Sequence, residues 1–305
     1  MTQTAKILVI RGGAIGDFVL TLPVFSAIRA QFPKVHLEVL GYPHVAALAT
    51  LDGTVDSVKP IESRALAGFF AAGGTLDPEW AEYFEQFALI ISYLYDPDDI
   101  FRTNVQRCTE AQYIAGPHRP GETAATHAAD ALLQPLERIA IFEPDAIPRI
   151  QLSTPAQLPT RPRVALHPGS GSERKNWPES KWRDFCALLV EKTNLDILLI
   201  SGEAEGQKAF RLASTVPEAR VTVAHARPLP DLAALLRASH SFVGHDSGIS
   251  HLSAALGVQS LLLWGDTNPE IWRPRNPQVT LLQNPAGLPG LPASRVFELW
   301  REWTR

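Results

Sequence analysis

The sequence predicts an α/β protein in which two doubly wound, Rossmann-like domains face each other across a central cleft. Strand-length apolar segments alternate with helical segments along most of the 305 residues. The alternation stops once, between residues 141 and 162, and then starts again. A chain of this length is large for one hydrophobic core and sufficient for two domains of ordinary size.

The first predicted domain, residues 1–150, begins with a strand, a glycine-rich turn and a helix. Gly12 and Gly13 allow the sharp turn after the strand. A second strand after this helix predicts a parallel sheet with right-handed crossovers. The pattern places strands at 6–10, 35–40, 57–60, 87–94 and 112–115, and helices at 17–32, 43–50, 64–71, 78–85 and 123–136.

A proline-rich linker is predicted at residues 151–162, because the segment shows no apolar periodicity. The second predicted domain, residues 163–292, repeats the strand–helix alternation. Residues 293–305 predict a C-terminal helix that we expect to pack back on the first domain. The strands of the second domain are predicted at 163–167, 196–201, 220–223, 241–243 and 260–264, and its helices at 178–193, 205–214, 229–238 and 248–257.

The composition is that of an ordinary globular protein, with 45% hydrophobic and 20% charged residues. The two cysteines, Cys108 and Cys186, are far apart, which argues against a disulfide scaffold and a zinc site. The first residues lead directly into a strand, so we expect no signal peptide. No apolar run is long enough to span a membrane. A reducing, cytoplasmic setting is therefore expected.

The charge is unevenly distributed between the halves of the chain. The net charge is −4, but residues 1–150 hold 11 Lys and Arg against 18 Asp and Glu, whereas residues 151–305 hold 17 against 14. The second half is therefore the expected position of an anionic ligand. Neither half is basic enough for nucleic acid to be the main partner.

Residues 243–257 predict a strand, a tight turn and a helix. Asp246 or Ser247 is placed to cap the helix, and His251 lies one turn further on. The first N–H groups of a helix have no helical partner, and its dipole favours an anion. This stretch is a candidate phosphate cradle; the alternative is an ordinary turn with a satisfied cap.

The loop at residues 167–178 is the second candidate for binding a diphosphate. Small residues at 169–172 allow a ligand to approach the backbone, and Arg174 and Lys175 supply positive charge. Hydrogen bonds from such charged groups contribute about 1.5–3 kcal/mol each. A solvated basic loop is the alternative. Because both candidate loops follow strands of one predicted sheet, together they favour a diphosphate site.

The loop at residues 12–17 has a different character. Its glycines do not have the Gly-x-Gly-x-x-Gly spacing, and no acidic residue ends the second strand. Asp17 at the helix start would repel a phosphate. We therefore interpret Asp17 either as a helix cap or as a carboxylate that acts as a general base in the cleft.

Four segments together resemble the ADP-heptose:lipopolysaccharide heptosyltransferase family, glycosyltransferase family 9. They run in the same order as in the family and span most of the chain. The segments are Arg-Gly-Gly-Ala-Ile-Gly-Asp at 11–17, His-Pro-Gly-Ser followed by Lys-Asn-Trp-Pro at 167–178, Gly-His-Asp-Ser-Gly-Ile-Ser-His at 244–251, and Trp-Gly-Asp-Thr-Asn-Pro with Trp-Arg-Pro at 264–274.

The resemblance implies a GT-B fold and an inverting, metal-independent transfer from a nucleotide-diphosphate sugar. Asp17 then matches the catalytic base and Lys175 the diphosphate-binding lysine. An ADP-linked donor is implied by the family alone, and no separate cofactor is expected. The further donor-binding positions implied are Ser170, Gly171, Asp246, Ser247, Gly248 and His251.

The expected acceptor is a hydroxyl of the lipopolysaccharide core or of another glycan or lipid-glycan, and the transferred sugar is a heptose or a related sugar. Arg11, Gly13 and Arg119 are the expected acceptor-binding residues. His118 and Arg119 follow a strand and are expected at the cleft, the alternative being a surface loop. Since the first half is acidic, either the acceptor is less anionic than the usual core or a few arginines bind it.

Other functions and locations stay open at this point. A peripheral contact with the cytoplasmic face of the inner membrane is one of them. A GT-B-like nucleotide-sugar epimerase or hydrolase, and a non-catalytic nucleotide-binding protein, are the alternatives to a glycosyltransferase.

Overall fold

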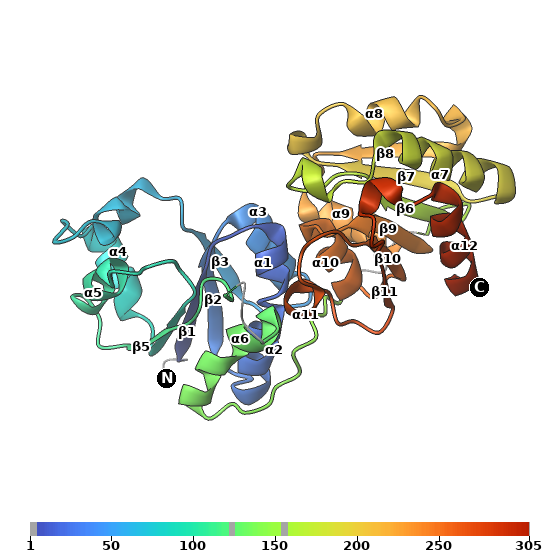
Figure 1. The fold of residues 1–305 in the computed structure, drawn as a ribbon. Helices are drawn as coiled ribbons and strands as arrows, with labels where there is room; N and C mark the ends of the chain where they lie inside the picture. The colour runs from blue at the N-terminus through green and yellow to red at the C-terminus, as the bar shows by residue number, and fades with distance from the viewer. Residues whose placement is uncertain (1–4, 122–125, 154–157, 305) are drawn as a thin grey trace. The chain divides into compact units, whose positions relative to one another are not determined.

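The computed structural model describes residues 5–121, 126–153 and 158–304, and the chain divides into two compact units, Met1–Ala146 and Ile147–Arg305 (Figure 1). Each unit has its own parallel sheet. The division falls before the predicted boundary at residue 150. Ile150 already belongs to the second unit, where its N–H donates to the Ala255 carbonyl over 2.9 Å. Part of the predicted linker, residues 154–157, lies outside the described residues.

The first unit contains a five-stranded parallel sheet in the order β3-β2-β1-β4-β5. From β1 the chain adds β2 and β3 on one side of β1, and then adds β4 and β5 on the other side of β1. The topological switch point therefore lies between β1 and β4. All five predicted strands of this unit form. Their bounds are β1 Lys6–Arg11, β2 His36–Gly41, β3 Ser57–Pro60, β4 Leu89–Ser92 and β5 Gln112–Ala115.

The predicted helix at 17–32 is two helices, α1 (Ile15–Val19) and α2 (Leu22–Gln31). Pro23 has no N–H, so it cannot donate to the carbonyl four residues earlier. At the same junction, the Thr21 N–H donates to the Phe18 carbonyl at 2.9 Å and not to that of Asp17. The Asp17 carbonyl accepts from Thr21 Oγ1 at 2.8 Å and from Arg11 Nη2 at 3.1 Å. Side-chain donors thus replace the backbone ladder at the junction of the two helices.

The remaining helical segments of the first unit include one that the sequence analysis missed, α5. It follows an aspartate-rich segment in which Asp96 accepts the N–H groups of Phe101 and Arg102. The predicted helix at 123–136 begins within residues that are not described. The segments are α3 Pro43–Ala46, η1 Ala47–Thr50, η2 Arg64–Phe70, α4 Pro78–Glu85, α5 Ile100–Gln106, α6 Ala128–Leu133 and η3 Gln134–Ile139, where η marks a 3₁₀ helix.

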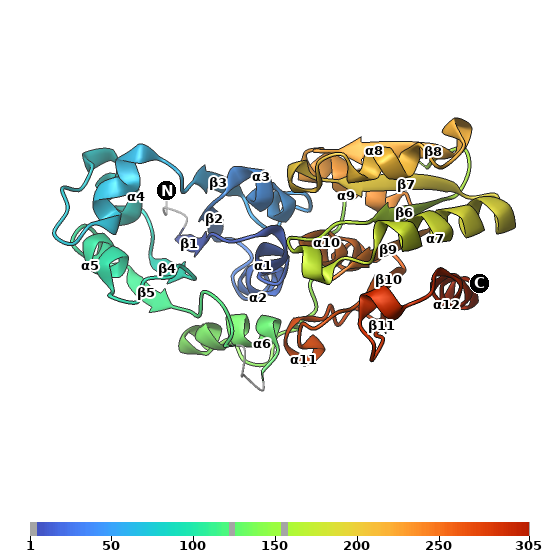
Figure 2. The same cartoon turned by 45° about the horizontal axis from the view of Figure 1, so that its top comes forward.

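The second unit contains a six-stranded parallel sheet in the order β11-β10-β9-β6-β7-β8, with the switch point between β6 and β9 (Figure 2). The outermost strand, β11, was not predicted, and all four of its residues are only half-buried. The other five were. The bounds are β6 Arg163–His167, β7 Asp196–Ser201, β8 Val221–His225, β9 Ser241–His245, β10 Ser260–Leu263 and β11 Val279–Leu282.

The longer helices of the second unit follow the predicted pattern. The short helix α11 was not predicted. Its first residue is Pro269, and Asn268 caps it. The bounds are α7 Glu179–Lys192, α8 Lys208–Ala213, α9 Leu229–Arg237, α10 Gly248–Ala255, α11 Pro269–Trp272 and α12 Ala293–Trp303, with short 3₁₀ turns η4 Glu173–Lys175, η5 Glu203–Glu205, η6 Glu218–Arg220 and η7 Leu288–Gly290.

The C-terminal helix forms where the sequence predicts it, and it joins the core of the second unit. The apolar face of α12 packs on α7 within the second unit. Phe297 and Trp300 join a core cluster that also contains Trp182 and Phe185. Trp300 Nε1 donates to Ser241 Oγ over 3.0 Å at the start of β9.

The first unit has a separate aromatic core cluster under α4 and α5, which contains Phe69, Trp80, Phe84 and Phe101. Across the described part of the chain, no helix combines the length and the apolar character needed to cross a membrane.

Replacing Trp300 with alanine should lower the free energy of unfolding of the second unit by about 3–5 kcal/mol. The side chain is only 2% exposed, so its removal leaves a large cavity in the core. Six of the seven tryptophans lie in the second unit, so tryptophan fluorescence during urea denaturation reports mainly on it. The half-buried Trp303, on the same helix, is the control and should cost clearly less. Equal losses would contradict the packing of α12 described above.

Candidate active site

The two candidate phosphate loops meet at the switch point of the second sheet. β6 and β9 are hydrogen-bonded neighbours, and their last residues include His167 and His245. β9 runs two residues further than predicted, so the turn before α10 is shorter. In open α/β sheets, ligands bind beyond the carboxyl ends of the strands at the switch point. The two loops that the sequence predicted at one end of a single sheet do follow neighbouring strands.

Ser247, one of the two residues predicted to cap this helix, is the N-cap of α10. Its Oγ accepts the Ser250 N–H at 3.4 Å and lies 3.2 Å from Nδ1 of His167. The Ser250 hydroxyl donates to the His245 carbonyl. These contacts fix the first turn of α10 against the end of β6, and its remaining N–H groups are those that a helix offers to an anion.

Lys175 and Asp246 form an ion pair that joins the two loops. Lys175 Nζ lies 2.5 Å from Asp246 Oδ2, and the exposed side-chain fractions are 38% and 10%. An ammonium group has three protons to donate. This contact uses one, so Asp246 fixes the position of Lys175 while the half-exposed ammonium retains donors for a ligand. The sequence analysis expected both residues at the donor site but did not expect them to pair.

His245 ties the Lys175 loop to the core. Its Nε2 accepts the Trp177 N–H at 2.8 Å, so in the neutral ring Nδ1 carries the proton, which it donates to the Gly169 carbonyl at 3.3 Å. The Trp177 indole donates to the Leu291 carbonyl over 3.0 Å. Both ends of the loop are thus anchored around Lys175.

Burial controls the protonation of the two histidines at this corner. It lowers the pKa of His167 to about 4 and that of His245 to about 3. Glu205 Oε1 lies 3.8 Å from His167 Nε2, which would favour a charged ring, but desolvation is the larger effect. Both rings are therefore neutral at pH 7.

Glu205 is a residue at this corner that the sequence analysis missed. It follows β7, the next strand of the sheet, and its Oε2 accepts the Gly202 N–H at 2.5 Å. A Cβ on Gly169 would lie 2.1 Å from the Glu205 side chain, so Gly169 is required for this approach. A carboxylate four residues beyond a strand end was the available signal.

The other predicted donor residues lie around the same corner. Ser170 is buried, and its Oγ donates to the Ser172 carbonyl at 2.8 Å and so shapes the loop. Gly171 is exposed, and a Cβ there would meet nothing within 4 Å, so space does not require glycine. Gly248 is the first residue of α10, and His251 is buried within that helix.

In the first unit, Asp17 occupies the third position of α1 rather than the cap itself. Its Oδ2 accepts the Ala14 N–H at 3.1 Å, so the carboxylate does stabilise the helix start as the simpler interpretation predicted. Gly13 has φ 101°, and a Cβ there would lie 3.1 Å from Asp17 Oδ2. Gly13 thus gives the carboxylate room. Among the described residues, Oδ1 has no hydrogen-bond partner and can accept one from a ligand.

The structure favours a positioning role for Arg11 over the predicted contact with an acceptor. The side chain is 4% exposed, and its guanidinium donates to the carbonyls of His118 at 2.7 Å and Asp17 at 3.1 Å. Burial lowers the pKa of the guanidinium, and the Asp17 charge opposes that shift. Arg119 and His118 are exposed at the surface of this unit, next to the end of β5.

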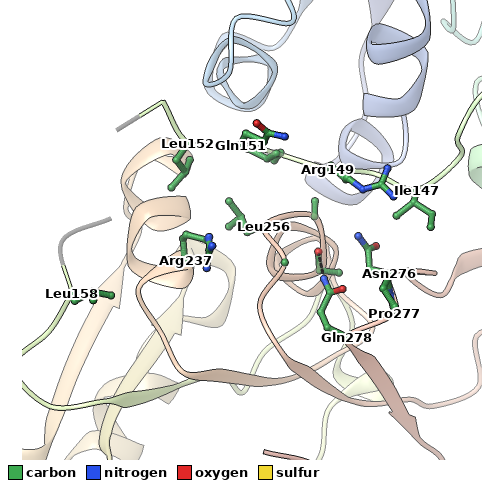
Figure 3. Close-up of a pocket in the computed structure, with 14 residues that line it drawn as sticks. Ile147, Arg149, Gln151, Leu152, Leu158, Arg237, Leu256, Asn276, Pro277 and Gln278 are labelled. Carbon is green, nitrogen blue, oxygen red and sulfur yellow. Dashed lines mark hydrogen bonds between the residues drawn. The ribbon is translucent and has the colours of Figure 1, made fainter. Parts of the chain in front are cut away.

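A cavity of about 640 Å³ lies at the opposite edge of the second sheet, beside the C-terminal end of α10 (Figure 3). Its lining includes Arg149, Arg237 and Gln278. Because Gln278 precedes β11 and Arg237 precedes β9, this cavity is at the amino ends of the strands. It takes no part in the corner that holds Lys175. Within the described ranges, no group of three His, Cys, Asp or Glu residues is arranged to hold a metal ion.

Two Rossmann-like units, one with a cation and a helix N-terminus at its switch point, are the architecture of glycosyltransferases with the GT-B fold. Residues 123–296, more than half of the chain, match the family model "Glycosyltransferase family 9 (heptosyltransferase)". The chain belongs to glycosyltransferase family 9 and is a heptosyltransferase-like enzyme.

Individual relatives agree with this family. A putative glycosyltransferase of Haemophilus influenzae is 24% identical over 302 residues, which cover 89% of this chain and 86% of the relative. Lipopolysaccharide heptosyltransferase 1 of Pseudomonas aeruginosa is 36% identical over 106 residues, 35% of this chain and 29% of the relative. The structure of E. coli heptosyltransferase WaaC with ADP has the same fold, with a TM-score of 0.78 and 20% identity over 98% of this chain and 99% of WaaC.

The buried histidines predict a loss of stability in acid. Unfolded imidazoles take up protons below about pH 6.5, whereas His245 and His167 stay neutral until about pH 3 and about pH 4. The free energy of unfolding should therefore have its full value above about pH 6.5. Below that pH, it should fall by about 1.4 kcal/mol per histidine for each pH unit. The comparison is between urea denaturation curves from pH 7.5 to pH 4.5.

The control is His245→Gln, whose amide oxygen replaces Nε2 as acceptor. This variant should lose one histidine's share of the pH dependence, whatever its stability at pH 7.5. An unchanged slope between pH 6.5 and pH 4.5 would show that His245 does not remain neutral in the folded protein.

Proposed function

We propose that this enzyme transfers a heptose, or a related sugar, from an ADP-linked donor to a hydroxyl of the lipopolysaccharide core or of another glycan, with inversion and without a metal ion. The observation that carries the proposal is the meeting of Lys175 and the N-terminus of α10 at the carboxyl ends of β6 and β9. The ADP in the WaaC structure supports the choice of nucleotide.

Lys175 and α10 suit a leaving diphosphate. As the bond between sugar and phosphate breaks, negative charge develops on the diphosphate, and pre-arranged donors stabilise that charge most. The Lys175 ammonium supplies a full positive charge, and the first N–H groups of α10 supply oriented dipoles. In this proposal, these two features take the role that a divalent cation has in other transferases.

Asp246 is proposed to keep Lys175 in place for this task. A lysine side chain has many rotamers, and ordering it on binding costs free energy. The 2.5 Å contact with Asp246 already orders the Lys175 side chain in the free protein, so less free energy is lost when a ligand binds. Asp246 is 10% exposed and would lose its partner in a Lys175 variant, which would leave an unpaired carboxylate beside the phosphates.

Asp17 is the proposed general base. Its Oδ1 is available to take the proton of an acceptor hydroxyl, and a direct attack by that hydroxyl on the sugar inverts its configuration. The backbone of Asp17 is held by Arg11 and Thr21, which fixes the direction of the carboxylate.

Lys175→Ala should weaken ADP binding about 10- to 150-fold, the range expected for one lost charge-assisted hydrogen bond. Isothermal titration with ADP measures this directly. Arg174→Ala is the matched control, because it removes an adjacent exposed cation and should change binding far less. Adding Asp246→Asn to the Lys175 variant should restore part of the affinity by removing the unpaired carboxylate. Normal ADP binding by Lys175→Ala would contradict the proposed donor site.

Asp17→Asn should reduce transfer about 10²- to 10⁴-fold while ADP binding stays unchanged, because the amide cannot accept the proton. Transfer is measured as acceptor-dependent release of ADP, with EDTA in one arm to test the absence of a metal requirement. Donor turnover without acceptor would instead indicate a hydrolase. If Asp17→Asn transfers sugar at the normal rate, another group is the base.

A further inference from the structure

We infer that a small pocket at the carboxyl edge of the first sheet binds an uncharged sugar ring of the acceptor. This inference rests on the proposed transferase function and adds the chemical class of the acceptor and the residues that select it. The pocket lies beyond the ends of β4 and β5 and is lined by residues of the segments 92–102 and 113–118.

The position of the pocket connects it to Asp17. β4 is the direct neighbour of β1, which carries the Asp17 loop at the same end. Arg11 links the three loops, because its Nη1 lies 2.7 Å from the His118 carbonyl and 3.5 Å from the Tyr93 carbonyl, and its Nη2 donates to Asp17. A ligand in this pocket is therefore at the same edge of one sheet as the proposed base.

The volume of the pocket fits a single ring. It measures about 220 Å³, room for roughly seven water molecules at ~30 Å³ each. This is below the range of about 300–1,000 Å³ that is usual for drug-sized ligands. This volume matches one monosaccharide unit of a longer glycan better than a whole nucleotide.

An exposed aromatic ring forms one wall. Tyr95 is 71% exposed, far more than the tyrosines of the core, and its ring stands edge-on to that of His118 with the centroids 4.6 Å apart. The face of an exposed aromatic ring can pack against an apolar surface of a ligand. The C–H face of a sugar ring is such a surface, and its hydroxyls suit the polar groups on the other walls.

Those polar groups are fixed in place. Asp96 uses both carboxylate oxygens on the N–H groups that begin α5. Asp99 has φ 52°, a left-handed conformation that aspartate tolerates better than most residues, and its Oδ1 lies 3.7 Å from Arg102. Burial raises the pKa of Tyr113 to about 12, so its phenol stays protonated. Hydroxyls of a sugar meet both donors and acceptors here.

The charge of the lining disfavours an anionic ring. Two aspartates, Asp96 and Asp99, face a single arginine, Arg102. The surrounding residues 1–150 are also net acidic, with 18 Asp and Glu against 11 Lys and Arg. A phosphate or carboxylate on the ring would be repelled, whereas a neutral hexose or heptose would not. The structure thus supports the less anionic acceptor of the two options that the charge distribution left open.

The experiment measures sugar binding without donor, by NMR titration of the full-length protein. The probes are the methyl glycosides of glucose, galactose and mannose, the methyl glucuronide, and glucose 6-phosphate. At least one neutral glycoside should bind more tightly than both charged sugars. Tyr95→Ala should weaken that binding about tenfold or more, and Tyr95→Phe should keep it within about threefold because the ring remains. Phe70→Ala removes another exposed aromatic ring of this unit, outside the pocket lining, and should have little effect.

A second variant tests the charge. Asp99→Asn keeps the shape and tolerates the left-handed backbone, and it should improve glucose 6-phosphate binding about three- to fivefold by removing a like charge. Two results would overturn the inference. One is that the unmodified protein binds the charged sugars more tightly than the neutral ones. The other is that the Tyr95→Ala variant binds the neutral glycoside as tightly as the unmodified protein. So would a protein that binds ADP but none of the sugars, and in that case the proposed donor site stands. Loss of ADP binding by the unmodified protein would count against the proposed function and leave the sugar titrations to decide the pocket.

Discussion

The hydrogen bond from the Trp177 N–H to the neutral Nε2 of His245 is the interaction on which the candidate active site depends. It joins the end of the loop after β6 to the end of β9, and the Nδ1–H of the same ring holds Gly169 at the other end of that loop. Only an uncharged imidazole can accept and donate in this way, and its complete burial keeps it uncharged. The loop between these anchors carries Lys175, so the position of the cation follows from the protonation state of a histidine that need not touch a ligand.

The sequence was sufficient for most of the strands in each half and for the two loops that meet after β6 and β9, because buried parallel strands have strong apolar runs and glycine-rich turns. It was insufficient where side chains replace backbone hydrogen bonds. The break between α1 and α2 depends on Arg11 and Thr21 reaching the Asp17 carbonyl. β11 escaped prediction because a half-buried edge strand has no clear periodicity. The packing surface of α12 depends on which core its stripe meets, and a stripe alone does not contain that information.

Candidate residues were predictable by type but not by partner. A cation after a strand end suggests ligand binding, yet Arg11 is buried on carbonyl groups, whereas Lys175 is half-exposed on a carboxylate. The difference comes from burial, which sequence spacing does not report. Glu205 was missed for the complementary reason: its importance lies in its approach to Gly169 and His167, residues far from it in the sequence.

Arg11 and Asp246 have equivalent tasks in the two units, since each holds a group that the proposed chemistry uses without needing to meet the substrate itself. Arg11 fixes the backbone of Asp17 and also the loops that carry Tyr95 and His118. A shift of the β1 loop would therefore be transmitted to the sugar-sized pocket through one guanidinium. Its buried Nε has no partner among the described residues, so the group gives up one hydrogen bond to reach carbonyls on separate loops. An unsatisfied buried donor costs about 1–3 kcal/mol. In return, the remaining hydrogen bonds of Arg11 hold the proposed base, Asp17, and the sugar-sized pocket in fixed positions relative to each other.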